Sequence, residues 1–213
     1  MRRQKLRTEV RKDQIGEAVL DLVTRGGLSA LSVAAVARRV GVTPSALYRH
    51  FPSKGAMLDA TLERIEQRVR ENVRIAEEQA ADPLEALGVL LARHVEMVRQ
   101  SRGVPLVLFS DDVYFRPTGH RERLKSLILG YAELVAGLVQ KGQRAGRIRR
   151  DIDPETLGVM FLGLFQPGAI LWHLTDGGFD ITRQAREAWK VFRSAIETPA
   201  RAHAARRAAR RNP

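Results

Sequence analysis

Polar and cationic side chains gather in the twelve residues from Thr43 to Lys54. Among them are two hydroxyls, a phenol, a guanidinium, an imidazole and an ammonium, carried by Thr43, Ser45, Tyr48, Arg49, His50 and Lys54. Such donors contact phosphate oxygens, and the planar fork of arginine also pairs with O6 and N7 of guanine. The stretch therefore favours polyanion recognition, with Arg49 as the candidate base reader and a further phosphate contact as its alternative role.

Catalytic chemistry finds little support elsewhere in the chain. The five histidines (50, 94, 120, 173 and 203) show no metal-ligand spacing, and no phosphate loop, nucleophile elbow or cysteine is present. Asp111 and Asp112 form an acidic pair, but adjacent residues on a helix do not face each other. The sequence predicts no enzyme, no catalytic residue, no metal site and no cofactor.

The charge distribution points to the same kind of partner. Lys and Arg number 36 against 24 Asp and Glu, which leaves a net charge of +12. Residues 1–54 hold 11 basic and 4 acidic side chains, and residues 201–213 hold 5 basic and none acidic. A basic end joined to a near-neutral body is typical of a nucleic-acid-binding part attached to a sensing or assembly part, although an arginine-rich composition alone would also give this excess. The absence of cysteine and of an apolar signal-peptide core favours the cytoplasm.

Three short helices are expected to position the polar stretch. Apolar spacing predicts a helix over about 8–25, a second over 33–40 with Ser32 as its N-cap, and a third over 44–50 opened by Pro44. A helix-turn-helix needs a small residue where its helices cross, a residue tolerant of positive φ at the turn, and an apolar residue that packs back. Ala37, Gly41 and Leu47 stand at those positions, although this spacing also occurs in ordinary core helices.

The rest of the chain also reads as helical, because apolar residues recur at three and four and alternation is rare. Helices are expected over about 54–78, 84–98, 106–114, 124–142, 154–174 and 180–197. The predicted class is all-α, with an N-terminal three-helix helix-turn-helix DNA-binding domain followed by a helical ligand-binding and dimerisation domain. The expected parts are a DNA-binding domain at 1–54 with a basic arm at about 1–8, an effector-binding and dimerisation domain at 55–198, and a basic tail at 199–213.

The run LSVAAVARRVGVTPSALYRHFPSKGAML, residues 31–58, resembles the TetR family of regulators. The likeness lies in Gly-Val-Thr, in Leu-Tyr-x-His-Phe and in a lysine three residues after the phenylalanine, and it is specific over about 10–65. Pro44 and Ser45 depart from common family usage, which bears on the operator sequence and leaves the fold unaffected.

The resemblance implies a role for each residue of the DNA-binding set. Ser32, Tyr48, His50 and Lys54 would contact phosphates, Thr43 would cap the recognition helix and Thr43 and Ser45 would reach base edges. Pro44 begins this helix at the DNA, and Arg2, Arg3, Lys5 and Arg7 would form either an arm or a solvated tail.

An apolar stretch from Leu157 to Leu174 contains no charged residue. A membrane span is disfavoured, because Gln166-Pro167-Gly168 interrupts it and its flanks are acidic. A helix that is apolar all round is instead buried on all sides, with one face against a second subunit. The resemblance implies a dimer bundle of 154–174 and 180–197, with interface residues Leu164, Leu171, Trp189 and Phe192 and a kink at Pro167.

The resemblance also implies an effector pocket in the body of the chain. Its candidates are His94, Met97, Phe109, Tyr114, Phe115, Tyr131, Phe161, Phe165, Gln166, Trp172 and His173. Aromatic walls with few polar groups suit a mostly apolar ligand, although each residue could equally be core. The expected function is that of a repressor that binds a palindromic operator as a homodimer under control of a small effector. The alternative is a nonspecific architectural DNA-binding protein.

Overall fold

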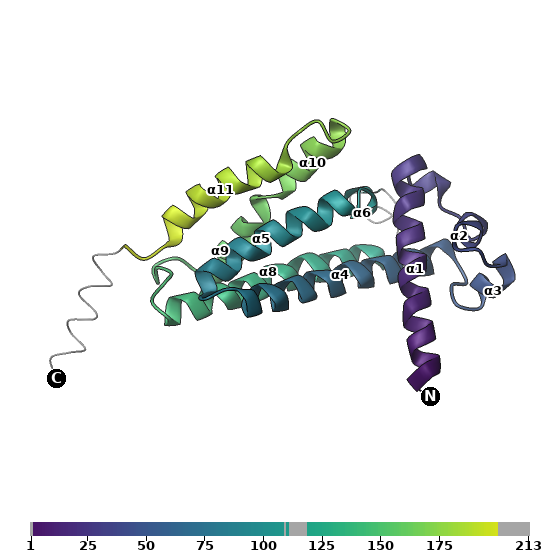
Figure 1. Cartoon of the computed structure of the whole chain (residues 1–213), viewed down its shortest axis with the longest axis horizontal. Helices are drawn as coiled ribbons and strands as arrows, with labels where there is room; N and C mark the ends of the chain where they lie inside the picture. The colour runs from purple at the N-terminus through teal and green to yellow at the C-terminus, as the bar shows by residue number, and fades with distance from the viewer. Residues whose placement is uncertain (1, 109, 111–118, 200–213) are drawn as a thin grey trace. The chain divides into compact units, whose positions relative to one another are not determined.

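The computed structural model describes residues 2–108, 110 and 119–199, with side chains from Gln14 onward (Figure 1). Regular structure in these ranges is helical apart from a short 3-10 turn and one isolated antiparallel bridge between Ile148 and Glu197, which confirms the all-α class. The elements are α1 (Arg2–Gly26), η1 (Leu28–Ala30), α2 (Val33–Val40), α3 (Pro44–Tyr48), α4 (Lys54–Gln79), α5 (Pro83–Gln100), α6 (Gly103–Leu108), α8 (His120–Arg144), α9 (Pro154–Gly163), α10 (Gln166–Leu174) and α11 (Ile181–Ile196).

Backbone contacts divide the chain into two compact units. The first contains residues up to Val69 together with 97–129, and the second contains 70–96 together with the residues from Gly130 onward. Three helices, α4, α5 and α8, contribute residues to both units.

The first unit is built around α1. Its inward face carries Ile15, Val19 and Val23, each at most 1% exposed, and these residues share one core with apolar residues of α2, α3, α4 and α6. The helix begins at Arg2, so the backbone of 2–8, expected as a basic arm, belongs to α1. Of the short helix expected over 106–114, residues 106–108 belong to α6, which begins at Gly103, and residues 109 and 111–114 lie outside the described residues.

The second unit packs α5, α8, α9, α10 and α11 together. Gly158 on α9 lies directly against α8, where an added Cβ would come within 2.5 Å of the Ala132 carbonyl oxygen. A larger residue at this position would therefore push the two helices apart. The glycine in the middle of α9 is explained by this close approach.

The apolar helix expected over 154–174 is two helices. α9 ends at Gly163 and α10 begins at Gln166, with Pro167 in the first turn of α10. The expectation of one kinked helix is corrected, because proline lacks the N–H that a continuous helix needs and suits a helix start better than a helix interior. The 21 residues of Pro154–Leu174 are long and apolar enough to cross a membrane by composition, but α9 and α10 have only 10 and 9 residues. A single span needs about 20 helical residues.

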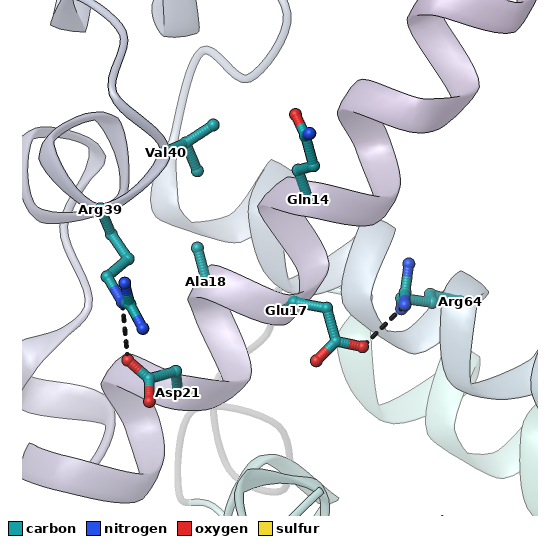
Figure 2. Close-up of a pocket in the computed structure, with 7 residues that line it drawn as sticks. All are labelled: Gln14, Glu17, Ala18, Asp21, Arg39, Val40 and Arg64. Carbon is teal, nitrogen blue, oxygen red and sulfur yellow. Dashed lines mark hydrogen bonds and ion pairs between the residues drawn. The ribbon is translucent and has the colours of Figure 1, made fainter.

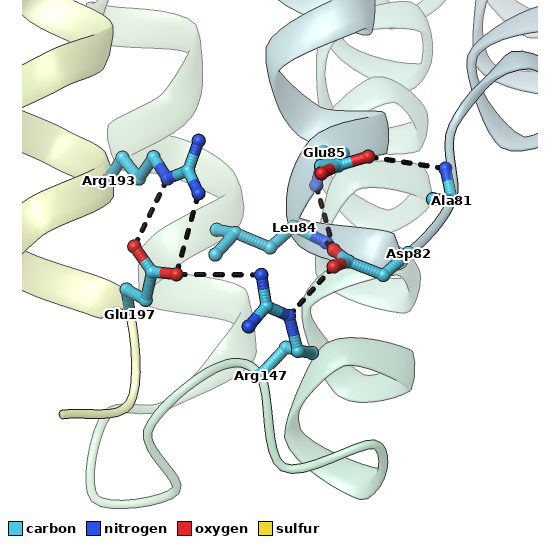
Figure 3. Close-up of polar contacts among 7 residues, drawn as sticks. All are labelled: Ala81, Asp82, Leu84, Glu85, Arg147, Arg193 and Glu197. Atoms are coloured by element: carbon cyan, nitrogen blue, oxygen red, sulfur yellow. Dashed lines mark hydrogen bonds and ion pairs between the residues drawn. The ribbon is translucent and has the colours of Figure 1, made fainter. Parts of the chain in front are cut away.

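A charged network joins three distant segments of the second unit (Figure 3). Asp82 accepts hydrogen bonds from the Leu84 and Glu85 amides at the start of α5, at 2.9 and 3.0 Å. Arg147, in the loop after α8, donates through Nε to Asp82 at 2.7 Å and lies 3.5 Å from Glu197 at the end of α11. Glu197 also pairs with Arg193 at 3.1 Å. Arg147 thus ties the start of α5 to the end of α11.

We expect Arg147→Met to lower the free energy of unfolding by about 1–2 kcal/mol at pH 7, because it leaves the half-buried Asp82 carboxylate without its cation. Partial burial raises the pKa of Asp82, but hydrogen bonds from the Glu85 amide and Arg147 outweigh it, so the pKa lies below its usual value. A carboxyl whose pKa is lowered in the folded state contributes its full stabilisation above the unfolded pKa of about 3.9. This stabilisation is lost as the pH falls through the folded pKa. The difference between mutant and wild type should therefore shrink below about pH 4.

Urea unfolding followed by circular dichroism from pH 7 to pH 3 measures this effect. The exposed Arg144 at the end of α8 supplies the control, Arg144→Met, which we expect to change stability by less than about 0.5 kcal/mol. A loss in Arg147→Met that stays constant across this pH range would contradict the assignment to Asp82.

Candidate nucleic-acid interface

The crossing of α2 and α3 has the predicted geometry. Ala37 is fully buried, Leu47 is 2% exposed, and Gly41 takes the left-handed conformation with φ 73°. The Gly41 amide closes α2 by donating to carbonyls of its last turn, and Val42 donates to Ala37. The chain therefore reverses within three residues, which confirms the helix-turn-helix inferred from these positions.

Both helices of the motif are capped by the predicted side chains. Ser32 accepts a hydrogen bond from the Ala35 amide at 3.1 Å, and Thr43 accepts one from the Ala46 amide at 3.3 Å. The Thr43 and Ser45 hydroxyls also lie 3.1 Å apart. Because α3 has only five residues and ends at Tyr48, earlier than the predicted His50, its first turn depends heavily on this cap.

The outer face of α3 is polar and open to solvent. Leu47 and Phe51 point into the core, whereas Tyr48 is 53% exposed. Apart from Lys54, every residue of the predicted DNA-binding set is exposed, namely Ser32, Thr43, Pro44, Ser45, Tyr48, Arg49 and His50. The exposed surface of the motif thus carries hydroxyl, phenol, imidazole and guanidinium groups, which can donate hydrogen bonds to phosphates and base edges.

Lys54 is placed differently from its neighbours. It is half-buried at the start of α4, and its Nζ donates to the Leu28 carbonyl oxygen in η1 at 2.8 Å. This bond spans 26 residues of sequence, so no local pattern indicates it. Lys54 therefore anchors α4 to the turn before α2, and its predicted phosphate contact stays a prediction.

Ion pairs brace α1 against its neighbours around an open hollow of about 640 Å³ (Figure 2). Arg39 of α2 donates through Nε to Asp21 at 2.9 Å, and Arg64 of α4 donates to Glu17 at 2.7 Å. The hydrogen bond from Arg39 is the main reason that the pKa of Asp21 is lowered. Arg38 and Arg39 also add exposed positive charge beside α3. These groups lie outside the 43–54 stretch, so the sequence argument missed them.

The start of α8 contacts the first half of α4. His120 is 4% exposed, and its Nδ1 lies 2.9 Å from Asp59 Oδ1. Arg123 lies 3.9 Å from Glu63 one turn further on. No sequence signal connects these pairs, which are about sixty residues apart in the chain. Within the described residues, no group of three His, Asp or Glu side chains is placed to hold a metal ion.

The predicted effector residues fall into separate groups. His94, Tyr131 and Phe165 form one ring cluster in the second unit, with centroids 5.3 Å apart for His94–Tyr131 and 3.8 Å for His94–Phe165. Phe161 contacts the ring of Phe192 instead, at 6.4 Å.

The other candidates lie elsewhere. Trp172 is buried, Gln166 and His173 are half-buried, and Met97 belongs to the first unit. Phe109, Tyr114 and Phe115 lie outside the described residues.

The predicted interface residues also differ in exposure. Leu171 is 44% exposed, Leu164 and Trp189 are half-buried, and Phe192 is 5% exposed within its own unit. Other large apolar side chains on α9, α10 and α11 are open to solvent, namely Val159, Met160, Ile170, Leu174 and Val191. Sequence alone did not separate Phe192 from Val191, because both lie in one amphipathic helix.

We expect Thr43→Ala to lower the free energy of unfolding by about 1 kcal/mol, because the first turn of α3 loses its side-chain acceptor. Thr43→Ser keeps the acceptor and serves as the matched control. Chemical denaturation of the two variants measures the difference, and equal stability would show that the cap does not hold α3.

Comparison with known proteins places both parts of the chain. Residues 15–61 match the model of bacterial regulatory proteins of the tetR family, and residues 80–196, more than half of the chain, match the tetracyclin repressor-like C-terminal domain. The nucleoid occlusion factor SlmA of Aliivibrio fischeri is 25% identical over 192 residues, which cover 88% of this chain and 96% of that protein.

Solved structures share the fold. The fatty acid degradation regulator FadR of Bacillus halodurans aligns with a TM-score of 0.75 and 20% identity, over 85% of this chain and 97% of its own. FadR of Bacillus subtilis, solved in complex with stearoyl-CoA, aligns with a TM-score of 0.72 and 18% identity, over 86% and 98%. Together with the capped helix-turn-helix and the helical body, these matches show that the chain is a DNA-binding regulator of the TetR family.

Proposed function

We propose that this regulator is a cytoplasmic repressor that binds a palindromic operator as a homodimer and is controlled by a small, mostly apolar effector. The observation that carries the proposal is the outward polar face of α3, held by the Thr43 cap and the Ala37–Leu47 crossing. A short helix presented in this way enters the major groove and offers its N-terminal half to base edges.

The residues of this face divide by chemistry. Arg49 carries a guanidinium that can bond two acceptors of one guanine, and Thr43 and Ser45 stand at the end of α3 that meets base edges. Tyr48, His50 and Ser32 offer single donors to phosphates. One such face reads few bases, whereas two related by a two-fold axis read half-sites roughly 34–36 Å apart.

Exposed apolar residues support dimerisation. Four apolar side chains on α9 and α10 are between 44% and 71% exposed, namely Val159, Met160, Leu171 and Leu174. They lie in the stretch from 157 to 174, which contains no charged residue. Apolar surface of this extent is rarely left open on a soluble protein unless another molecule covers it. A second copy of α9, α10 and α11 would cover these side chains with its own. Phe192 then supports the interface from within, and Val191 takes the interface position on α11.

The ring cluster of His94, Tyr131 and Phe165 supports an effector site in the second unit. Aromatic walls with few polar groups are typical of sites for apolar or amphipathic ligands. The stearoyl-CoA in the Bacillus subtilis FadR structure is a ligand of that kind in a protein of the same fold. An effector that prefers the conformation unable to bind DNA would shift the population toward it and release the operator.

A nonspecific architectural role is the alternative, and the SlmA relatives are named for nucleoid occlusion, without reference to an effector. A specific regulator prefers its operator over bulk DNA by about 10³-fold or more. Operator selection from random DNA followed by competition with bulk DNA separates the two. A ratio of operator affinity to bulk-DNA affinity near one would overturn the proposal.

We expect Arg49→Ala to weaken operator binding by about 1–3 kcal/mol and to relax specificity at one base pair. Arg49→Lys is the matched control, because lysine keeps the charge and loses the planar fork. Base reading predicts that Arg49→Lys relaxes specificity as alanine does. A phosphate contact predicts that Arg49→Lys retains the wild-type base preference, and that result would contradict base reading. Binding to a library of single-base operator variants measures both.

We expect wild type to be a dimer at micromolar concentration and Leu171→Glu to be a monomer, because a carboxylate would be buried without a partner in the interface. Leu129 on α8 is exposed to a similar extent, 49% against 44%, so Leu129→Glu is the control and should remain dimeric. Light scattering after size-exclusion chromatography measures the mass. A monomeric wild type, or a dimeric Leu171→Glu, would show that this face is not the interface.

A further inference from the structure

Two polar atoms are buried in the ring cluster without a hydrogen-bond partner. They are Nδ1 of His94 and the hydroxyl of Tyr131, on side chains that are 7% and 4% exposed. The His94 and Tyr131 rings stack with an interplanar angle of 23°, and Phe165 packs against the His94 ring. Buried polar atoms are nearly always paired, so two unpaired atoms on adjacent rings require an explanation.

The chain could have avoided this cost. Phenylalanine at 131 would fill the same space without a hydroxyl, and an apolar residue at 94 would keep the core contacts without a ring nitrogen. Burying a polar group without a partner opposes folding. Because both atoms are unpaired in the same cluster, a partner from outside the chain accounts for them together.

The surroundings determine what charge such a partner can carry. Burial lowers the pKa of His94 to about 3 and raises the pKa of Tyr131, so both are neutral at pH 7. Besides these, Asn72 is the one buried polar side chain among the described residues of this unit, and it already accepts a hydrogen bond from Arg93 at 3.2 Å. The half-buried Gln184 adds a buried, unpaired Oε1, which is uncharged. An ionised ligand group would therefore lose its hydration without a buried counter-ion.

Resting on the proposed effector control, we propose that His94 and Tyr131 bind the uncharged oxygen, a hydroxyl or a carbonyl, of an otherwise apolar effector. A neutral imidazole offers one donor and one acceptor, and a phenol offers the same pair, so a single hydroxyl or carbonyl oxygen satisfies both rings. The apolar part of the effector would lie among the surrounding core side chains, and Phe165 would move aside or pack against it.

Two amphiphiles of equal chain length, 1-dodecanol and sodium dodecanoate, test whether the site prefers an uncharged oxygen to an ionised group. By calorimetry at pH 7.5 we expect wild type to bind 1-dodecanol at least tenfold more tightly than dodecanoate. Tyr131→Phe and His94→Leu should each weaken 1-dodecanol binding about fivefold or more. Tighter binding of dodecanoate, binding of neither amphiphile, or unchanged 1-dodecanol binding in both variants would overturn the proposal.

The ligand-free protein provides a second readout. Tyr131→Phe removes an unpaired buried hydroxyl and should raise Tm by about 2–4 °C. Tyr48→Phe removes an exposed hydroxyl and should leave Tm unchanged. A lower Tm in Tyr131→Phe would show that the hydroxyl already has a partner, such as a buried water, and would overturn the inference.

Operator binding is measured on the same samples to separate the two proposals. Normal operator preference without 1-dodecanol binding would overturn the effector chemistry alone. Selective 1-dodecanol binding without operator preference would overturn the proposed repressor function and leave the polar site standing.

Discussion

The proposed DNA-binding face depends on the close crossing of α2 and α3. Ala37 leaves room for the second helix, Leu47 fills that room, and Gly41 takes a φ of 73° that a larger residue adopts only with strain. If any of these three changes, the outward residues of α3 lose their common orientation. Specific recognition of bases requires such orientation, because direct readout depends on the geometry of paired donors and acceptors.

Local signals predicted much of the fold, because they describe short stretches of backbone. Ser32, for example, caps α2 where a hydroxyl precedes an apolar periodic run. Contacts between distant segments were not predictable in this way. The Lys54–Leu28 bond and the His120–Asp59 pair depend on tertiary packing, and one sequence carries no record of which helices meet. The break between α9 and α10 was predicted only as a kink at Pro167, because the apolar pattern continues across it.

Several features of the second unit oppose its own stability. Apolar side chains stand exposed on α9, α10 and α11, and buried polar atoms are unpaired within it, among them the two in the ring cluster. Folded proteins have a margin of only about 5–15 kcal/mol, so such features persist when they serve another purpose. A partner subunit and a ligand are the two purposes that fit them, because each would bury or pair the group that the single chain leaves unsatisfied.

The helix α8 carries residues of both units, including Tyr131 of the proposed effector site and His120 of the first unit. Tyr131 and His120 lie eleven residues apart on this one continuous helix, which is about three turns. His120 contacts Asp59 on α4, and α4 begins with Lys54, whose ammonium holds the turn before α2. The His120–Asp59 pair and the Lys54–Leu28 bond therefore link α8, α4 and the turn before α2 within the first unit.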